Sequence, residues 1–205
     1  MYLFSIECIS HLTGIAVLTG KKVIAKKIWK SEDPCVEILP QIDKMLKKTG
    51  MKPEMFDYFV VSSGPGSWTG IRLGMSVAYG LSIANEKKIF CVSSLEGMAY
   101  RFKNNEYTGV FLPSAGKSVH YGIFKNPGIL AKKHGRFHVC SIGELSLKLK
   151  KANIVAGPSR EILSLFSPSK HTIKRVFPDP ILNAVLAYER IKNSVKPKNQ
   201  PYYEK

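Results

Sequence analysis

Three short runs near the start of the chain, rich in apolar and β-branched residues, predict β-strands. They cover residues 2–6, 14–18 and 23–29. Thr19-Gly20-Lys21 separates the last two runs, and this turn predicts that they form a hairpin. In the third run the apolar and polar residues do not separate onto two faces, so its pattern leaves open which side is buried.

The next segment changes to helical spacing and predicts an amphipathic helix from about Pro34 to Lys48. Asp33 is suited to accept backbone N–H groups of the first turn, and Gly50 is expected to end the helix. Pro40 removes one backbone donor inside this helix, which predicts a kink there.

The first half of the chain is organised around a strand, a tight turn and a second helix. Residues 59–61 form a short apolar strand, Gly64-Pro65-Gly66 predicts the turn, and a helix is expected from Thr69 to Ala84. Either Ser67 or Thr69 can cap this helix through its side-chain oxygen.

Along this second helix Gly70, Gly74 and Ala78 fall four residues apart, so one face carries almost no side chain and another backbone can approach it closely. A glycine-rich turn before a helix can also bind phosphate. However, the dinucleotide pattern GxGxxG does not fit, and the Lys-Ser or Lys-Thr pair of a P-loop is absent from the turn. A structural corner followed by a closely packed helix is therefore favoured over a phosphate site.

A strand at Ile89–Val92 and a short helix from Ser94 towards Arg101 complete the first half. Three antiparallel strands, a helix, and then parallel strands alternating with helices is the order of a ribonuclease-H-like unit.

The same order of elements recurs after Asn104-Asn105. In this second half Gly157-Pro158-Ser159 repeats part of the earlier Gly64-Pro65-Gly66-Ser67 turn. We predict an α/β fold with two lobes of ribonuclease-H-like (actin-like ATPase) topology, a mixed sheet flanked by helices, and an abbreviated second lobe. The predicted domains are residues 1–103 and 104–205. Strands are expected at 110–112, 119–124, 136–140 and 153–156, and helices at 144–151 and 178–194.

The charge balance is strongly basic. The 205 residues include 31 Lys and Arg against 15 Asp and Glu, a formal net charge of +16. Such a charge attracts nucleic acids or acidic proteins, but the lysines are scattered as doublets, without the interleaved aromatic and arginine residues of RNA-binding motifs. A solvated basic surface is favoured, and direct binding of nucleic acid is left open.

Cys8, Cys35, Cys91 and Cys140 form no CxxC pair, which favours reduced thiols over a disulfide framework or a zinc site. No apolar run approaches the ~20 residues of a membrane helix, and the N-terminus does not have the pattern of a signal peptide. We expect a soluble cytoplasmic protein that binds neither a metal nor a membrane.

The stretch from Gly64 to Gly74, GPGSWTGIRLG, closely resembles the GPGSFTGLRIG signature of the TsaB (YeaZ) family, whose members have an actin-like fold. Many positions match the family up to about Phe102, and few match after it. The supporting matches are Ile6-Glu7-Cys8-Ile9-Ser10, Ile38-Leu39-Pro40-Gln41-Ile42-Asp43, Val92-Ser93-Ser94-Leu95 and Pro201-Tyr202-Tyr203.

The resemblance implies a role in forming N6-threonylcarbamoyladenosine (t6A) at position 37 of tRNAs. In that family TsaB is the non-catalytic partner of its paralogue TsaD, and the ATPase TsaE joins them. The chain is expected to form a heterodimer with TsaD; a homodimer of the free protein is left open, and any tRNA contact is expected to be indirect or weak. No cofactor of its own is expected, and ATP or ADP bound at the contact with TsaD is left open.

A contact with TsaD would use faces of the two predicted helices, where close approach across small residues increases dispersion contacts. The alternative is that these faces only cover the chain's own sheet. The candidate interface residues are Ile38, Ile42, Met45, Gly70, Leu73, Gly74, Val77 and Ala78.

In actin-like enzymes an acidic residue at the end of the first strand positions metal-bound phosphate, and an acidic turn in the second lobe faces it. Glu7 and Ser10 are the candidates for a vestigial cleft of this kind. The family's Asp-Ala-Arg run aligns with Pro113-Ser114-Ala115, which contains no acid. We therefore expect no catalytic residue and no autonomous ATP hydrolysis. The alternative is an actin-like ATPase or phosphotransferase with a degenerate cleft.

Overall fold

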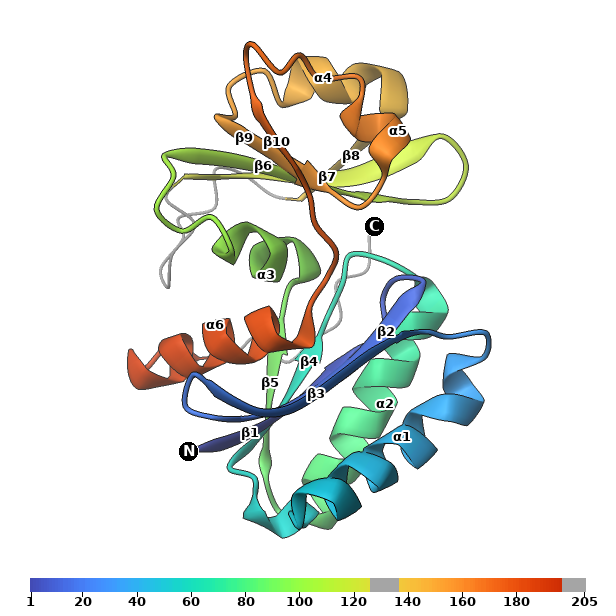
Figure 1. Cartoon of the computed structure of the whole chain (residues 1–205), viewed down its shortest axis with the longest axis vertical. Coiled ribbons are helices and arrows are strands. Elements are labelled where there is room, and N and C mark those ends of the chain that lie inside the picture. The colour runs from blue at the N-terminus through green and yellow to red at the C-terminus, as the bar shows by residue number, and fades with distance from the viewer. Residues whose placement is uncertain (126–136, 197–205) are drawn as a thin grey trace. The chain divides into compact units, whose positions relative to one another are not determined.

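The computed structural model describes residues 1–125 and 137–196, which separate into two compact units (Figure 1). The first unit comprises Met1–Ser94 together with the segment that begins at Pro178, and the second comprises Leu95–Phe177. The Pro201-Tyr202-Tyr203 match to the family tail lies outside the described residues.

The first unit contains a five-stranded mixed sheet in the order β3-β2-β1-β4-β5. Strand β1 is central, antiparallel to β2 and parallel to β4. All five predicted strands are confirmed, each slightly longer than its apolar run. Their bounds are β1 (Tyr2–Glu7), β2 (Leu12–Thr19), β3 (Lys22–Lys30), β4 (Tyr58–Ser62) and β5 (Lys88–Val92).

Helices cover both faces of this sheet: α1 (Pro34–Thr49) and α2 (Trp68–Ala84) lie on one face and α6 (Pro180–Lys192) on the other (Figure 1). The short turn η1 (Pro53–Met55) precedes β4. As predicted, the Asp33 side chain caps α1, and Gly50 ends it in the left-handed region at φ 65°. Of the two candidate caps for α2, the one used is Ser67, whose Oγ accepts from Gly70 N at 3.2 Å.

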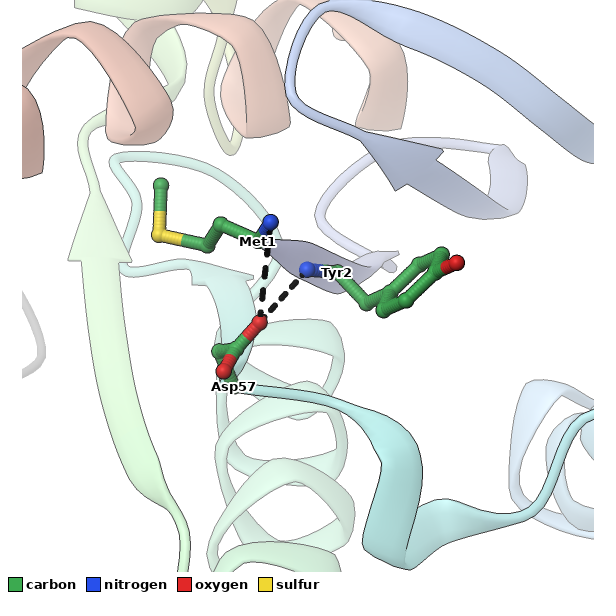
Figure 2. A network of polar contacts seen from close by, with 3 residues as sticks. All are labelled: Met1, Tyr2 and Asp57. Carbon is green, nitrogen blue, oxygen red and sulfur yellow. Dashed lines mark hydrogen bonds and ion pairs between the residues drawn. The ribbon is translucent and has the colours of Figure 1, made fainter.

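The start of the central strand is held by Asp57, the residue before β4 (Figure 2). Its Oδ2 accepts a hydrogen bond from the Tyr2 backbone at 2.6 Å and lies 3.9 Å from the Met1 nitrogen. The Asp57 N–H in turn donates to the Tyr2 carbonyl at 2.9 Å. These contacts fix the start of β1 beside β4.

The second unit repeats the topology of the first. Its sheet order, read as β8-β7-β6-β9-β10, matches β3-β2-β1-β4-β5, with β6–β7 and β7–β8 antiparallel and β6–β9 and β9–β10 parallel. The predicted duplication is therefore confirmed. The strands are β6 (Tyr107–Pro113), β7 (Ser118–Lys125), β8 (His138–Ser141), β9 (Ile154–Gly157) and β10 (Thr172–Arg175).

The helices of the second unit are short: α3 (Ser94–Tyr100) opens it, and η2 (Ile142–Glu144), α4 (Leu145–Lys148) and α5 (Arg160–Leu163) follow. The helix predicted at 144–151 thus ends earlier, at Lys148. The core joins sheet and helix residues, among them Phe111, Val119, Leu145, Leu149, Val155, Ile162 and Phe166.

The last helix departs from the predicted boundary between residues 103 and 104. Helix α6 packs against β1, β2, β4 and β5, so the chain returns to the first unit instead of ending in the second. The physical reason is its apolar face, in which Pro180, Ala184, Leu186 and Ala187 are buried.

Candidate functional site at the end of strand β1

Glu7, the last residue of β1, is a buried carboxyl group held by three parts of the first unit. Its side chain is 1% exposed. Oε1 accepts from the Ile9 backbone N–H at 3.0 Å, and Oε2 accepts from Asn183 Nδ2 on helix α6 at 2.8 Å. The Ser62 hydroxyl at the end of β4 also donates to it, and Ser62 shares a 2.7 Å hydrogen bond with Ser94. This polar cluster joins β1, β4 and α6.

Burial raises the pKa of Glu7 from 4.5 to about 7, because desolvation disfavours the charged form. The hydrogen bonds from Ile9, Asn183 and Ser62 oppose this rise in pKa, and the nearby Asp179 carboxylate adds to it. A metal-binding carboxylate must be ionised and directed at the ion. In this structure both oxygens of Glu7 are bonded within the protein, and the pKa of the carboxyl group lies near neutrality.

Ser10, the second cleft candidate, closes a local turn. Its Oγ accepts from the Leu12 N–H at 3.2 Å and donates to the Leu12 carbonyl at 3.1 Å. Glu7 and Ser10 therefore lie in one turn but have separate partners. Because the Ile9 and Leu12 amides are bonded to these two side chains, they do not form a phosphate cradle.

The Gly-Pro turn packs directly on this first turn. Ser67 N donates to the Ile9 carbonyl at 2.8 Å. A Cβ atom on Gly66 would lie 2.8 Å from Ile9, and one on Gly70 only 1.9 Å from the Cys8 carbonyl oxygen. The glycines are required by this close backbone approach, which confirms the interpretation as a structural corner.

The bare helix face predicted for a partner is instead covered by the chain's own strands. Gly70, Gly74 and Ala78 are buried, and a Cβ on Gly74 would lie 3.3 Å from Val61 Cγ2 of β4. Ile38, Ile42 and Met45 of α1 are also buried. For these six residues the alternative, that they cover the sheet, is the correct one. Only Leu73 and Val77 of the eight candidates keep a half-buried surface.

The apolar side chains that α1 and α2 do expose were missed, because helical periodicity alone does not say which apolar stripe faces the sheet. Val36 and Leu39 on α1 are 68% and 56% exposed, and Trp68 and Ile83 on α2 are 50% and 75% exposed. Asn183 was missed as well. The available signal was a polar residue at a buried position of α6, between Pro180 and Ala184.

In the second unit, Pro113-Ser114-Ala115 lies at the hairpin between β6 and β7, where Ser114 N donates to the Ser118 carbonyl. This turn contains no acidic residue. Within residues 1–125 and 137–196, no three His, Cys, Asp or Glu side chains gather as a metal site would require. In the same ranges no helix has both the length and the apolar character needed to cross a membrane.

The thiols behave as buried core groups, with the exception of exposed Cys35. Cys8, Cys91 and Cys140 are buried and free. Burial raises the pKa of Cys91 to about 12 and also raises the pKa of Cys8 well above its ordinary value. A thiol with such a high pKa is a poor nucleophile.

The duplicated units define a two-lobed α/β protein of the actin-like class. YeaZ from Pseudomonas aeruginosa superposes with a TM-score of 0.80 at 17% identity, over 99% of both chains. The activator of 2-hydroxyisocaproyl-CoA dehydratase from Clostridium difficile, with bound ADPNP, gives a TM-score of 0.60 at 12% identity, over 95% of this chain and 97% of that one. At these identities the likeness concerns the fold.

Sequence comparison gives the family. The family model described as "TsaD: tRNA N6-adenosine threonylcarbamoyltransferase" matches residues 32–153, more than half of the chain. The tRNA threonylcarbamoyladenosine biosynthesis protein TsaB of Bacillus subtilis is 34% identical over 100 residues, which are 48% of this chain and 44% of that protein. The chain thus belongs to the TsaD family, and its match to this TsaB protein spans less than half of that relative's length.

Proposed function

We propose that this protein is a non-catalytic subunit of the machinery that forms t6A at position 37 of tRNAs. The family membership supports the pathway. The observation that carries the non-catalytic role is the state of Glu7, whose oxygens bond to Ile9 and Asn183 inside the first unit. The hairpin at Pro113-Ser114-Ala115 adds no acid that would complete a metal-phosphate site.

In this proposal the partner is the catalytic paralogue TsaD, with the ATPase TsaE joining the pair. The contact would use the outer surface of α1 and α2, where Val36, Leu39 and Ile83 expose apolar side chains. Leu73 and Val77 would add their half-buried edges. Large apolar side chains exposed on neighbouring helices are available to pack against a partner.

The test is the mass of a mixture with TsaD, measured by light scattering after size exclusion. The wild-type chain should form a stoichiometric complex with TsaD, and the double variant Leu39→Glu/Ile83→Glu should not. Leu147→Glu/Leu165→Glu is the matched control, because these side chains of the second unit are 64% and 49% exposed. A wild-type chain that stays monomeric beside TsaD would refute the proposed role.

An actin-like ATPase is the second candidate, favoured by the acidic residue at the end of β1, where such enzymes have their metal-phosphate acid. Calorimetry with Mg-ATP separates the two. Micromolar binding that is lost in Glu7→Ala would favour the ATPase. The proposed subunit role instead predicts no binding by the free chain.

A further inference from the structure

The positive charge of the protein is unevenly divided between its two units. Leu95–Phe177 contains 14 Lys and Arg against 4 Asp and Glu, although it is the smaller unit. Along the sequence these lysines look scattered. The fold of the second unit brings several of them to one end of its sheet.

That end is defined by the register of four strands. Thr108 of β6 and Thr172 of β10 both pair with Ile154 of β9, so these three parallel strands begin side by side. Tyr107, the first residue of β6, pairs with Lys125, the last residue of β7. Neighbouring strands are about 4.8 Å apart, so the four chain ends form a compact edge.

Hydrogen bonds fix the segments that carry the lysines. Asn153 Oδ1 accepts from Tyr107 N at 3.0 Å, Thr172 N donates to the Asn153 carbonyl at 2.8 Å, and His171 Nδ1 lies 2.8 Å from the Ala152 carbonyl. The lysines flank these bonds directly in sequence. We call this group the basic end of the second unit, and it consists of Lys125, Lys150, Lys151 and Lys170.

All four side chains are exposed, and none of the ion pairs found among the described residues joins one of them to a carboxylate. Lys125 Nζ lies 5.7 Å from the centre of the Tyr107 ring. Glu106 is the one acid adjacent in sequence to β6 here. At the opposite end of the sheet two acids, Glu144 and Glu161, accompany Lys117, Arg160 and Arg175.

We propose that the basic end of the second unit binds the phosphate backbone of RNA. A compact set of four exposed lysines that outnumber the single nearby acid and form no ion pair with it gives the positive potential that phosphate binding requires. Lysine is a point charge without the bidentate geometry of arginine, so the contact positions the RNA and does not read its sequence. The RNA is tRNA if the proposed function holds, and this identity is the part of the inference that rests on it.

The test is fluorescence anisotropy of the full chain with a labelled, unmodified tRNA transcript between 50 and 300 mM salt. In Lys150→Gln/Lys151→Gln/Lys170→Gln, affinity at low salt should fall about tenfold or more, and the slope of log K against log salt should shrink by about 2. The matched control is Lys26→Gln/Lys44→Gln/Lys48→Gln, which removes the same charge from exposed positions of the first unit and should bind as the wild type does. Circular dichroism melts should show both variants folded.

An equal loss of affinity for the transcript in both triple variants, or no binding of the transcript by the wild type at 50 mM salt, would overturn the proposal that this end of the sheet is the binding site. Equal affinity for a DNA duplex of similar length would overturn its assignment to RNA. The two proposals can fail independently. If the chain binds tRNA but forms no complex with TsaD, the RNA-binding site stands and the proposed subunit role is wrong.

Discussion

Asn183 on the last helix donates a 2.8 Å hydrogen bond to the carboxyl group of Glu7, at the end of the first strand, across 176 residues of sequence. This bond ties α6 to the central strand at the point where an actin-like enzyme would have its metal-phosphate acid. The burial of Glu7 at this point also makes the stability of the first unit depend on pH.

The first prediction concerns the Glu7 carboxyl. Its pKa is about 7 in the folded protein and 4.5 as an unperturbed group, so between these values the folded state binds more protons than the unfolded state. The contribution of this group to stability is therefore most favourable below about pH 4.5 and is lost as the pH rises through 7. As the pH rises from 5 to 8, the free energy of unfolding of the neutral variant Glu7→Gln should increase relative to that of the wild type by up to about 3 kcal/mol.

Urea unfolding at both pH values measures that difference, with Glu54→Gln at an exposed position as the control. A constant difference between Glu7→Gln and the wild type over this range would show that Glu7 is ionised in both states.

The second prediction concerns the donor. Asn183→Ala removes a hydrogen bond to a buried charge, which should cost about 2 kcal/mol at pH 8. The loss should be smaller at pH 5, where Glu7 is protonated, because the Asn183 bond favours the charged form. Asn85→Ala is a suitable control, since its Nδ2 bonds to the Leu81 carbonyl near the end of α2. An equal loss of stability at both pH values would contradict the coupling.

The sequence predicted the strands and their order because alternating runs, turn residues and the repeated Gly-Pro corner are local signals. Strand β10 was missed because Thr172–Arg175 contains one apolar residue, Ile173, and lies at the sheet edge. The Asn183–Glu7 bond has only a weak local signal, the polar Asn183 within the apolar face of α6. It depends on where α6 packs, and the chain's return to the first unit was not foreseen.

The burial of the candidate interface residues was misjudged for a similar reason. Leu39 and Ile42 belong to one apolar stripe by periodicity, yet Leu39 is 56% exposed and Ile42 only 4%. Which part of a wide stripe faces the sheet depends on tertiary packing, and a single helix pattern does not contain that information.

The third prediction concerns the start of β1 (Figure 2). Asp57→Ala removes the acceptor of the Tyr2 N–H and should destabilise the first unit by at most about 1 kcal/mol, because the site is partly exposed. Hydrogen exchange at the Tyr2 amide should accelerate. Asp43→Ala, which breaks the exposed pair with Lys47, should leave that amide unchanged. Unchanged protection of Tyr2 in Asp57→Ala would mean that strand pairing alone holds it.

The last prediction separates the two roles considered for the glycines of α2. Gly70→Ala places a methyl group 1.9 Å from the Cys8 carbonyl oxygen, and neither backbone segment can move without breaking the corner, so the variant should lose at least about 3 kcal/mol or fail to fold. Gly80→Ala on the same helix meets nothing within 4 Å and should stabilise the protein by about 0.5–1 kcal/mol through helix propensity. Thermal melts of both variants without a partner are sufficient. If Gly70→Ala melted like the wild type and lost only binding to TsaD, the glycine face would belong to an interface and not to the corner beneath Glu7.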